Sequence, residues 1–100
     1  RAIEFYEQAL VIDKEIGDRR GEGTWLNNLG VVFKDMENYD LALACYLSAR
    51  TIRRELKDPN IEMTENNINN LKTKLGEKRF QKLLDTVEPN AEEIIQQLLT

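Results

Sequence analysis

Apolar residues recur along this chain at intervals of three and four, the spacing that gathers them on one face of an α-helix. Segment 22–36 has the widest such face, formed by Trp25, Leu26, Leu29, Val32, Phe33 and Met36. Narrower apolar faces mark the segments 1–16, 41–56, 59–75, 77–87 and 90–99. No credible strand is present. The pattern predicts an all-α protein of about six helices.

The sequence pattern of the helix predicted for residues 1–16 is repeated at residues 41–56. Six identities occur at a spacing of 40 residues: Ala2/Ala42, Tyr6/Tyr46, Ala9/Ala49, Ile12/Ile52, Glu15/Glu55 and Asp18/Asp58. A fixed period of this length indicates a helical repeat whose copies stack on one another. A weaker copy follows, because Ile68-Asn69-Asn70-Leu71 repeats Leu26-Asn27-Asn28-Leu29 at a spacing of 42.

Several residues predict where these helices end and begin. Gly17 favours the left-handed cap of a helix C-terminus, and Asp18 can cap the helix that follows. Asp58-Pro59 is expected to supply the N-cap and the first-turn proline of the helix after segment 41–56. Near the C-terminus, Asn90 followed three residues later by Glu93 is a capping-box pattern for the last helix.

The pattern Leu26-x2-Leu29-Gly30-x2-Phe33, followed by Ala42-x3-Tyr46 and Ala49, resembles the signature of the tetratricopeptide repeat. The period of 40 residues departs from that family's usual 34 and resembles the extended repeats of kinesin light chain and of bacterial arrays. The resemblance implies antiparallel helix pairs stacked into a right-handed α-solenoid with C-terminal capping helices. It divides the single domain, residues 1–100, into the second helix of a truncated repeat (1–17), one complete repeat (22–57), a degenerate repeat (59–87) and a capping helix (90–99).

Small residues predict where the two helices of the complete repeat cross. Gly30 has no side chain, so we expect segment 22–36 to approach segment 41–56 closely at Ala42. Phe33 and Tyr46 are large enough to fill the volume around this contact. A large side chain at position 30 would overpack the contact.

The resemblance also implies a function, because the first helix of each pair in this family lines a concave groove that binds a peptide segment of a partner protein. The expected groove residues are Thr24, Asn27, Asn28, Val31, Lys34 and Asp35 in the complete repeat and Asn66, Asn69, Asn70 and Thr73 in the degenerate one. Thr24 and Asn27 lie opposite the apolar face of their helix, so its packing does not require them. Asparagine amides both donate and accept hydrogen bonds, which suits a peptide backbone. The alternative interpretation, that these are ordinary polar residues of a solvent-facing helix, stays open.

The charge and the apolar runs of the chain argue against several classes of partner. The chain has 18 acidic and 14 basic residues and a net charge of −4, which argues against nucleic acid, since phosphate binding depends on clustered basic residues. No apolar run is long enough for a membrane span, so we expect no membrane partner. The groove subtype that clamps a peptide C-terminus is disfavoured, because Lys34 and Lys74 are the basic residues that could serve it.

No combination of catalytic residues is evident. The chain has no His, no Gly-rich phosphate loop, and no Ser or Cys with a base beside it, so we expect no enzymatic activity, no cofactor and no metal site. The single Cys45 lies among apolar neighbours and can form no internal disulfide. This is typical of a reducing compartment and predicts a cytoplasmic location.

The chain begins inside a helical pattern with no start signal, which predicts a fragment from the C-terminal end of a longer array. The helix that should pair with segment 1–16 is then absent, so Ile3, Tyr6 and Leu10 are expected to face water in part and to promote self-association. A competing hypothesis is a purely structural cap with no ligand of its own. A binding module should leave its groove open, whereas a cap should fill the groove with its own C-terminal helix.

Overall fold

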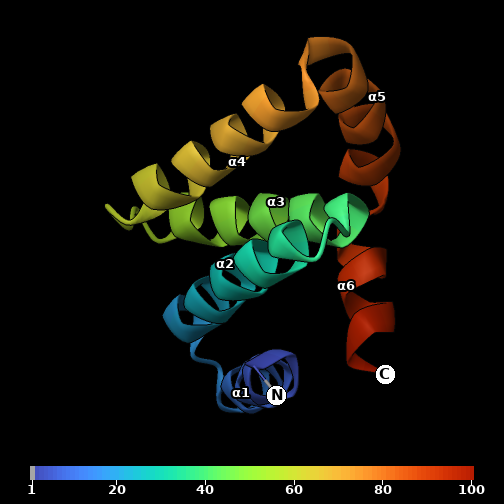
Figure 1. The fold of residues 1–100 in the computed structure, drawn as a ribbon. Coiled ribbons are helices and arrows are strands. Elements are labelled where there is room, and N and C mark those ends of the chain that lie inside the picture. Colours follow the sequence, from blue (N-terminus) through green and yellow to red (C-terminus); the bar gives the residue numbers. More distant parts are fainter. Residues whose placement is uncertain (1) are drawn as a thin grey trace.

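The computed structural model describes residues 2–100, which contain α-helices, one short 3-10 helix and no strand (Figure 1). The helices are α1 (Ala2–Ile16), α2 (Arg19–Asp35), α3 (Tyr39–Glu55), α4 (Ile61–Leu75), α5 (Glu77–Val87) and α6 (Ala91–Leu99), with the 3-10 helix η1 (Glu88–Asn90) between the last two. The all-α class predicted from the sequence is confirmed.

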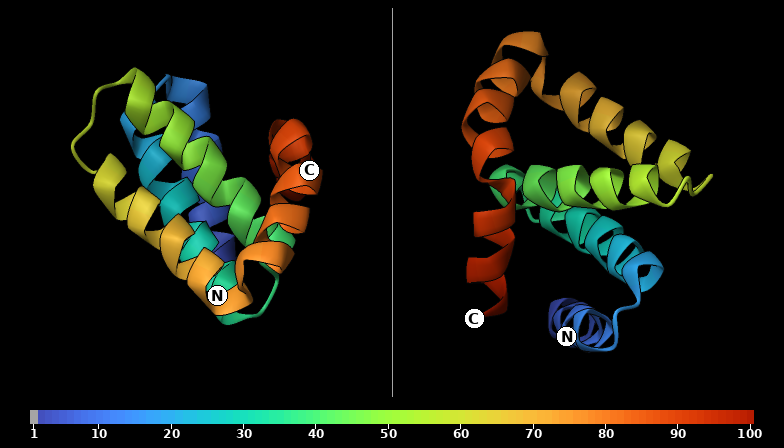
Figure 2. Two further views of the ribbon diagram at one scale, coloured as in Figure 1. Left: turned by 90° about the horizontal axis from the view of Figure 1, so that it is seen from above. Right: turned by 180° about the vertical axis from the view of Figure 1, so that it is seen from behind.

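Each helix from α1 to α4 packs against the next one along the chain (Figures 1 and 2). Helices α2, α3 and α4 run back and forth, with α3 lying between the other two, and α1 packs against α2. At the end where α3 begins and α4 finishes, α5 crosses both, and α6 then packs against α3. This is the predicted arrangement of antiparallel helix pairs, followed by two helices that leave the direction of the stack.

The hydrophobic core is centred on α3. Every residue from Ala42 to Leu47 is buried, although a helix with one solvent face would expose about half of such a run. The burial arises because α2, α4, α5 and α6 all pack around α3. Leu10 of α1, Leu29 of α2 and Leu71 of α4, none of which has exposed surface, complete the core.

Helices α1, α2 and α3 end in the same way. Gly17, Glu37 and Lys57 each adopt a left-handed backbone, with φ angles of 76°, 63° and 53°. The N–H of the following residue then donates to the carbonyl five positions earlier at 2.8 Å in all three turns, as Asp18 to Asp13, Asn38 to Phe33 and Asp58 to Arg53. The cap predicted at Gly17 is confirmed. The left-handed caps at Glu37 and Lys57 were not predicted, because Glu and Lys are not residue types that signal a left-handed end.

The second helix starts earlier than predicted. α2 begins at Arg19 instead of residue 22, because the Asp18 carboxylate accepts a hydrogen bond from Gly21 N at 2.9 Å and caps a turn that includes this glycine. α3 likewise spans Tyr39–Glu55 instead of 41–56. The predicted capping role of Asp18 is confirmed.

Two predicted side-chain caps are absent. Asp58-Pro59 precedes a turn and not the first turn of α4: the buried Asp58 side chain accepts a hydrogen bond from Asn60 N at 2.9 Å, and α4 begins at Ile61. Asn90 makes no side-chain bond to α6, so the capping box is absent. Its amide donates to Thr86 O at 3.0 Å, because η1 joins α5 directly to α6 and keeps Asn90 beside the last turn of α5.

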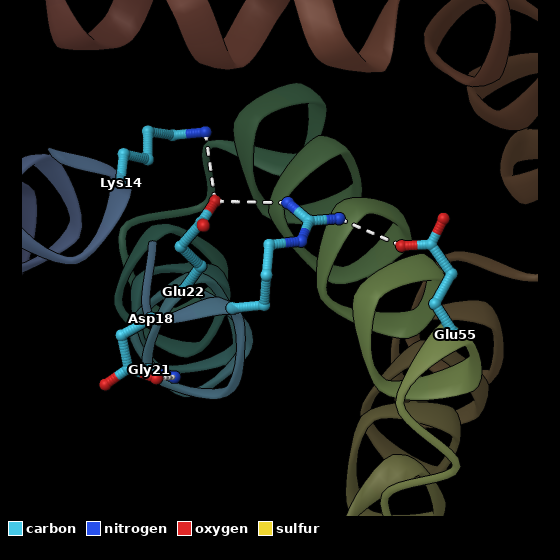
Figure 3. Close-up of polar contacts among 6 residues, drawn as sticks. Lys14, Asp18, Gly21, Glu22 and Glu55 are labelled. Atoms are coloured by element: carbon cyan, nitrogen blue, oxygen red, sulfur yellow. Dashed lines mark hydrogen bonds and ion pairs between the residues drawn. The ribbon is translucent and has the colours of Figure 1, made fainter. Parts of the chain in front are cut away.

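A charged cluster ties the first three helices together (Figure 3). The Glu22 carboxylate accepts hydrogen bonds from Lys14 Nζ of α1 at 3.2 Å and from Arg19 Nη1 at 3.3 Å. Arg19 also donates from Nη2 to Glu55 of α3 at 2.9 Å. Glu22 is 3% exposed, and its burial is offset by the two cations. The cluster therefore helps to fix α1 against α2 and α3.

The solvent-facing side of α1 differs from the expected one. Leu10 is fully buried, so the expectation that it faces water is wrong, while Ile3 and Tyr6 are half-buried. Trp25 of α2 covers Tyr6, and the two rings stack with centroids 5.7 Å apart. The large apolar residues that α1 does present to solvent are Phe5, Val11, Ile12 and Ile16, which are 59%, 36%, 55% and 70% exposed.

An aromatic ring sets the crossing of α2 and α3. A Cβ atom at Gly30 would collide with Cδ1 and Cε1 of Tyr46, whose side chain is almost fully buried. The close approach expected at Gly30 is therefore present, but its nearest partner is Tyr46 and not Ala42. The sequence could not separate the two, since both lie on the same face of α3.

Candidate binding face of α2 and α4

Eight of the residues expected to line a groove form a surface on two neighbouring helices. We call this surface the α2/α4 polar face: Asn28, Val31, Lys34 and Asp35 of α2, with Asn66, Asn69, Asn70 and Thr73 of α4. All four residues of α4 are exposed; in α2, Val31 and Asp35 are exposed and Asn28 and Lys34 are half-buried. Helices α2 and α4 contact each other and both pack against α3, so one side of each remains in solvent.

Asn27 does not belong to this face. Its side chain is 3% exposed, and its Oδ1 accepts hydrogen bonds from Thr64 Oγ1 at 3.0 Å and from Asn67 Nδ2 at 3.1 Å. Both donors lie on α4, which covers this side of α2. The expectation that packing does not require Asn27 is therefore wrong: a single amide joins the two helices.

The bonds of Asn27 continue into a buried network around Arg53 of α3. Arg53 is 4% exposed, and its Nη1 donates to Thr64 Oγ1 at 2.9 Å and to Asn60 O at 3.1 Å. Burial lowers the pKa of the Arg53 guanidinium from its usual value, and the negative charge of Asp58 opposes this change. Within residues 2–100, Arg53 Nε has no hydrogen-bond partner. Thr64 thus connects α2, α3 and α4.

The roles of Thr64, Asn67 and Arg53 were not predicted from the sequence, although the position of Thr64 carried a signal. It continues the apolar stripe Ile68, Leu71 and Leu75 of α4 at helical spacing, and all four residues are buried. A polar side chain on a buried stripe needs a partner, so Thr64 could have been predicted to bond across a helix interface. Arg53 offered no such signal, since it stands in a charged run beside the exposed Arg54.

Thr24 lies on the same side of α2 as Asn28 and Val31, one turn nearer the start of the helix. It is half-buried, and its Oγ1 donates to Arg20 O at 3.2 Å within its own helix. Thr24 lines a cavity of about 500 Å³ together with Ile12 and Asp13 of α1 and the neighbouring Trp25. Thr24 therefore lies where this side of α2 comes next to α1.

The described side chains provide hydrogen-bonding surface and little reactive chemistry. Burial, and then the negative charge of Glu7, raise the pKa of the Cys45 thiol to about 12, so the thiol stays protonated near neutral pH. Across residues 2–100, no three His, Cys, Asp or Glu side chains are placed to hold a metal ion. No helix within the same range has the length and apolar character to cross a membrane.

Comparison with known families gives a match to the tetratricopeptide repeat over residues 1–55. The matched region spans α1, α2 and α3, and so includes both helices that share the spacing of 40 residues. Comparisons with curated proteins and with solved structures give no match.

Proposed function

Because this chain belongs to the tetratricopeptide repeat family, we propose that it holds an extended peptide segment of a partner protein on the α2/α4 polar face. Repeats of this family generally serve as non-catalytic scaffolds for protein interactions. Residues 22–57 would act as the complete repeat in this assembly, and α4 would extend its binding surface.

The position of α6 is the observation that supports binding over a purely structural cap. α6 packs against α3, where Ala91 and Glu92 line a cavity together with Ser48 and Thr51. A cap without a ligand would instead place its last helix over the α2/α4 polar face. The amides of Asn66, Asn69 and Asn70 on α4 stay exposed and can pair with a peptide backbone.

A peptide selection tests this proposal. Peptides selected from a random library on residues 1–100 are measured by calorimetry against the chain and against the double variant Asn28→Ala/Asn70→Ala. Two lost hydrogen bonds of about 1 kcal/mol each predict a weakening of at least about tenfold. The control Gln96→Ala/Gln97→Ala, which changes two exposed amides of α6, should bind as the unchanged chain does. Equal affinity of both double variants would contradict the proposal.

A second candidate function, self-association through α1, is supported by the internal repeat. Ile12 is 55% exposed, whereas Ile52, its counterpart in α3, is 5% exposed and lies against the position of Gly23 in α2. The equivalent position of the repeat is thus covered in α3 and exposed in α1. An exposed apolar face of this kind favours association.

The spacing on α1 points to a second copy of the chain as the occupant of this face. Phe5, Ala9, Ile12 and Ile16 follow one another at intervals of four, three and four residues, which read the same in both directions. Two α1 helices related by a two-fold axis would place Ala9 against Ile12 and Phe5 against Ile16.

Light scattering over a range of concentrations measures this association. The chain should form dimers, and Ile12→Glu should return it to monomer. The matched variant Val31→Glu, at another exposed apolar residue, should leave the dimer intact. A monomer throughout the range would refute self-association and leave the peptide-binding proposal unaffected.

A further inference from the structure

One segment of this acidic protein has a net positive charge. Residues 72–82 contain five Lys or Arg and one Glu, whereas the remainder of the chain contains nine basic and seventeen acidic residues. The five are Lys72, Lys74, Lys78, Arg79 and Lys82, all exposed, at the end of α4 and in the first half of α5. This corner of the molecule attracts anions, although the protein as a whole repels them.

A cavity of about 410 Å³ opens beside two of these cations. It lies where α5 crosses the start of α3 and the end of α4 (Figure 1), and its walls include Tyr39 and Asp40 of α3, Leu75 of α4, and Arg79, Lys82 and Leu83 of α5. None of the residues of the α2/α4 polar face lines this cavity. It is therefore a second candidate site, distinct from that face.

The lining of the cavity combines apolar and basic side chains. Leu75 is buried except for 9% of its surface, and Tyr39 and Leu83 are half-buried, so the exposed carbon atoms of these three residues form surface that an apolar side chain can cover. Arg79 and Lys82 are exposed, and within residues 2–100 neither forms an ion pair. The two cations are thus available to a ligand without breaking an existing contact.

We propose that this cavity binds an acidic peptide segment in which an apolar side chain is flanked by carboxylates. The apolar side chain covers Leu75 and Leu83, and the carboxylates pair with Lys82 and with the guanidinium of Arg79, which can bind a carboxylate through two parallel hydrogen bonds. Asp40, on the α3 side, repels the carboxylates and directs them toward α5. A long polyanion such as nucleic acid is disfavoured, because the acidic surface beyond segment 72–82 would repel it.

Fluorescence anisotropy with a labelled six-residue peptide of two leucines and four glutamates tests the site. We expect saturable binding that weakens with added salt. Arg79→Glu/Lys82→Glu should weaken binding at least tenfold. Lys72→Glu/Lys78→Glu makes the same change in net charge outside the cavity and should weaken binding less than threefold. Asp40→Asn should tighten binding. Replacing the leucines of the peptide by serine should abolish binding.

Several outcomes would overturn the proposal. Equal losses in the two charge-reversal pairs would indicate diffuse attraction, and the absence of binding at millimolar peptide would exclude the site. Binding to phosphatidylserine vesicles without binding to the peptide would assign the basic corner to lipid instead. Circular dichroism verifies that each variant is folded, and the neutral pair Arg79→Gln/Lys82→Gln replaces the reversed pair if that one is unfolded.

The variant Asn28→Ala/Asn70→Ala, which changes the α2/α4 polar face, distinguishes the cavity site from the peptide-binding site under Proposed function. It should bind the acidic peptide with unchanged affinity, since neither residue lines the cavity. Loss of acidic-peptide binding in that variant would mean that the two faces form one site, and the separate cavity site would be rejected.

Discussion

Helices α2 and α4 contain nearly the same four residues, Leu26-Asn27-Asn28-Leu29 and Ile68-Asn69-Asn70-Leu71, in different surroundings. The apolar residues of both are buried, but Asn27 is 3% exposed and bonded to α4, whereas Asn69 is exposed. The difference lies in the next helix: α4 continues the stack beside α2, whereas the chain turns away after α4 into α5 (Figure 1). The same motif gives a packing residue where the stack continues and a surface residue where it stops.

A second difference lies one turn further along the two helices. Gly30 of α2 lies directly against the ring of Tyr46, whereas Lys72, its counterpart 42 residues later in α4, is exposed. α2 is therefore closely packed against α3 along this face, while α4 presents a charged side chain to water at the equivalent position. Three pairs of matched substitutions test these differences through the free energy of unfolding.

The largest effect is expected for Gly30→Leu. The added side chain collides with the buried ring of Tyr46, and we expect the free energy of unfolding to fall by about 3 kcal/mol. The matched substitution Lys72→Leu should change it by less than about 0.5 kcal/mol, because that position is exposed. Thermal unfolding followed by circular dichroism measures both. An unchanged melting temperature in Gly30→Leu would mean that α2 crosses α3 elsewhere.

A smaller effect is expected for Asn27→Ala. It leaves the hydroxyl of Thr64 and the amide of Asn67 without their acceptor, which should cost about 2 kcal/mol. Asn69→Ala, the same change at the equivalent position of α4, should be neutral or slightly stabilising, because alanine is the better helix former. Urea unfolding of both variants gives the comparison. Equal costs would show that α4 does not hold Asn27 in the way described.

The smallest effect is expected at the C-terminal end of α2. Glu37 adopts a φ of 63°, whereas α4 ends on Gly76, with a φ of 85°, where glycine is already in place. Glu37→Gly should therefore raise the free energy of unfolding by about 0.5 kcal/mol, as relief of left-handed strain outweighs the added freedom of the unfolded chain. Asp35→Gly, inside the helix, should lower it by a similar amount. Destabilisation by both glycine substitutions would contradict the inference that the left-handed backbone of Glu37 is strained.

The sequence predicted much of the fold because its signals are local or periodic. Helical spacing of apolar residues located all six helices, and the cap at Gly17-Asp18 and the small residue at Gly30 were identified correctly. The side-chain caps predicted for α4 and α6 were wrong, since Asp58 and Asn90 bond to groups of the preceding turns, which the sequence does not define. Of the candidate site, the exposed amides of α4 were predicted and the burial of Asn27 was not.

By itself, the sequence determined the helices, their pairing and the crossing at a glycine, because spacing, residue size and internal repetition act through neighbours in the chain. Tertiary structure alone decided which of two equivalent asparagines became buried, that the ring of Tyr46 and not Ala42 lies nearest to Gly30, and that Arg53 joins a network through Thr64. Each of these depends on which helix covers a given side of another. That choice is made by the packing of the whole stack, and no single segment encodes it.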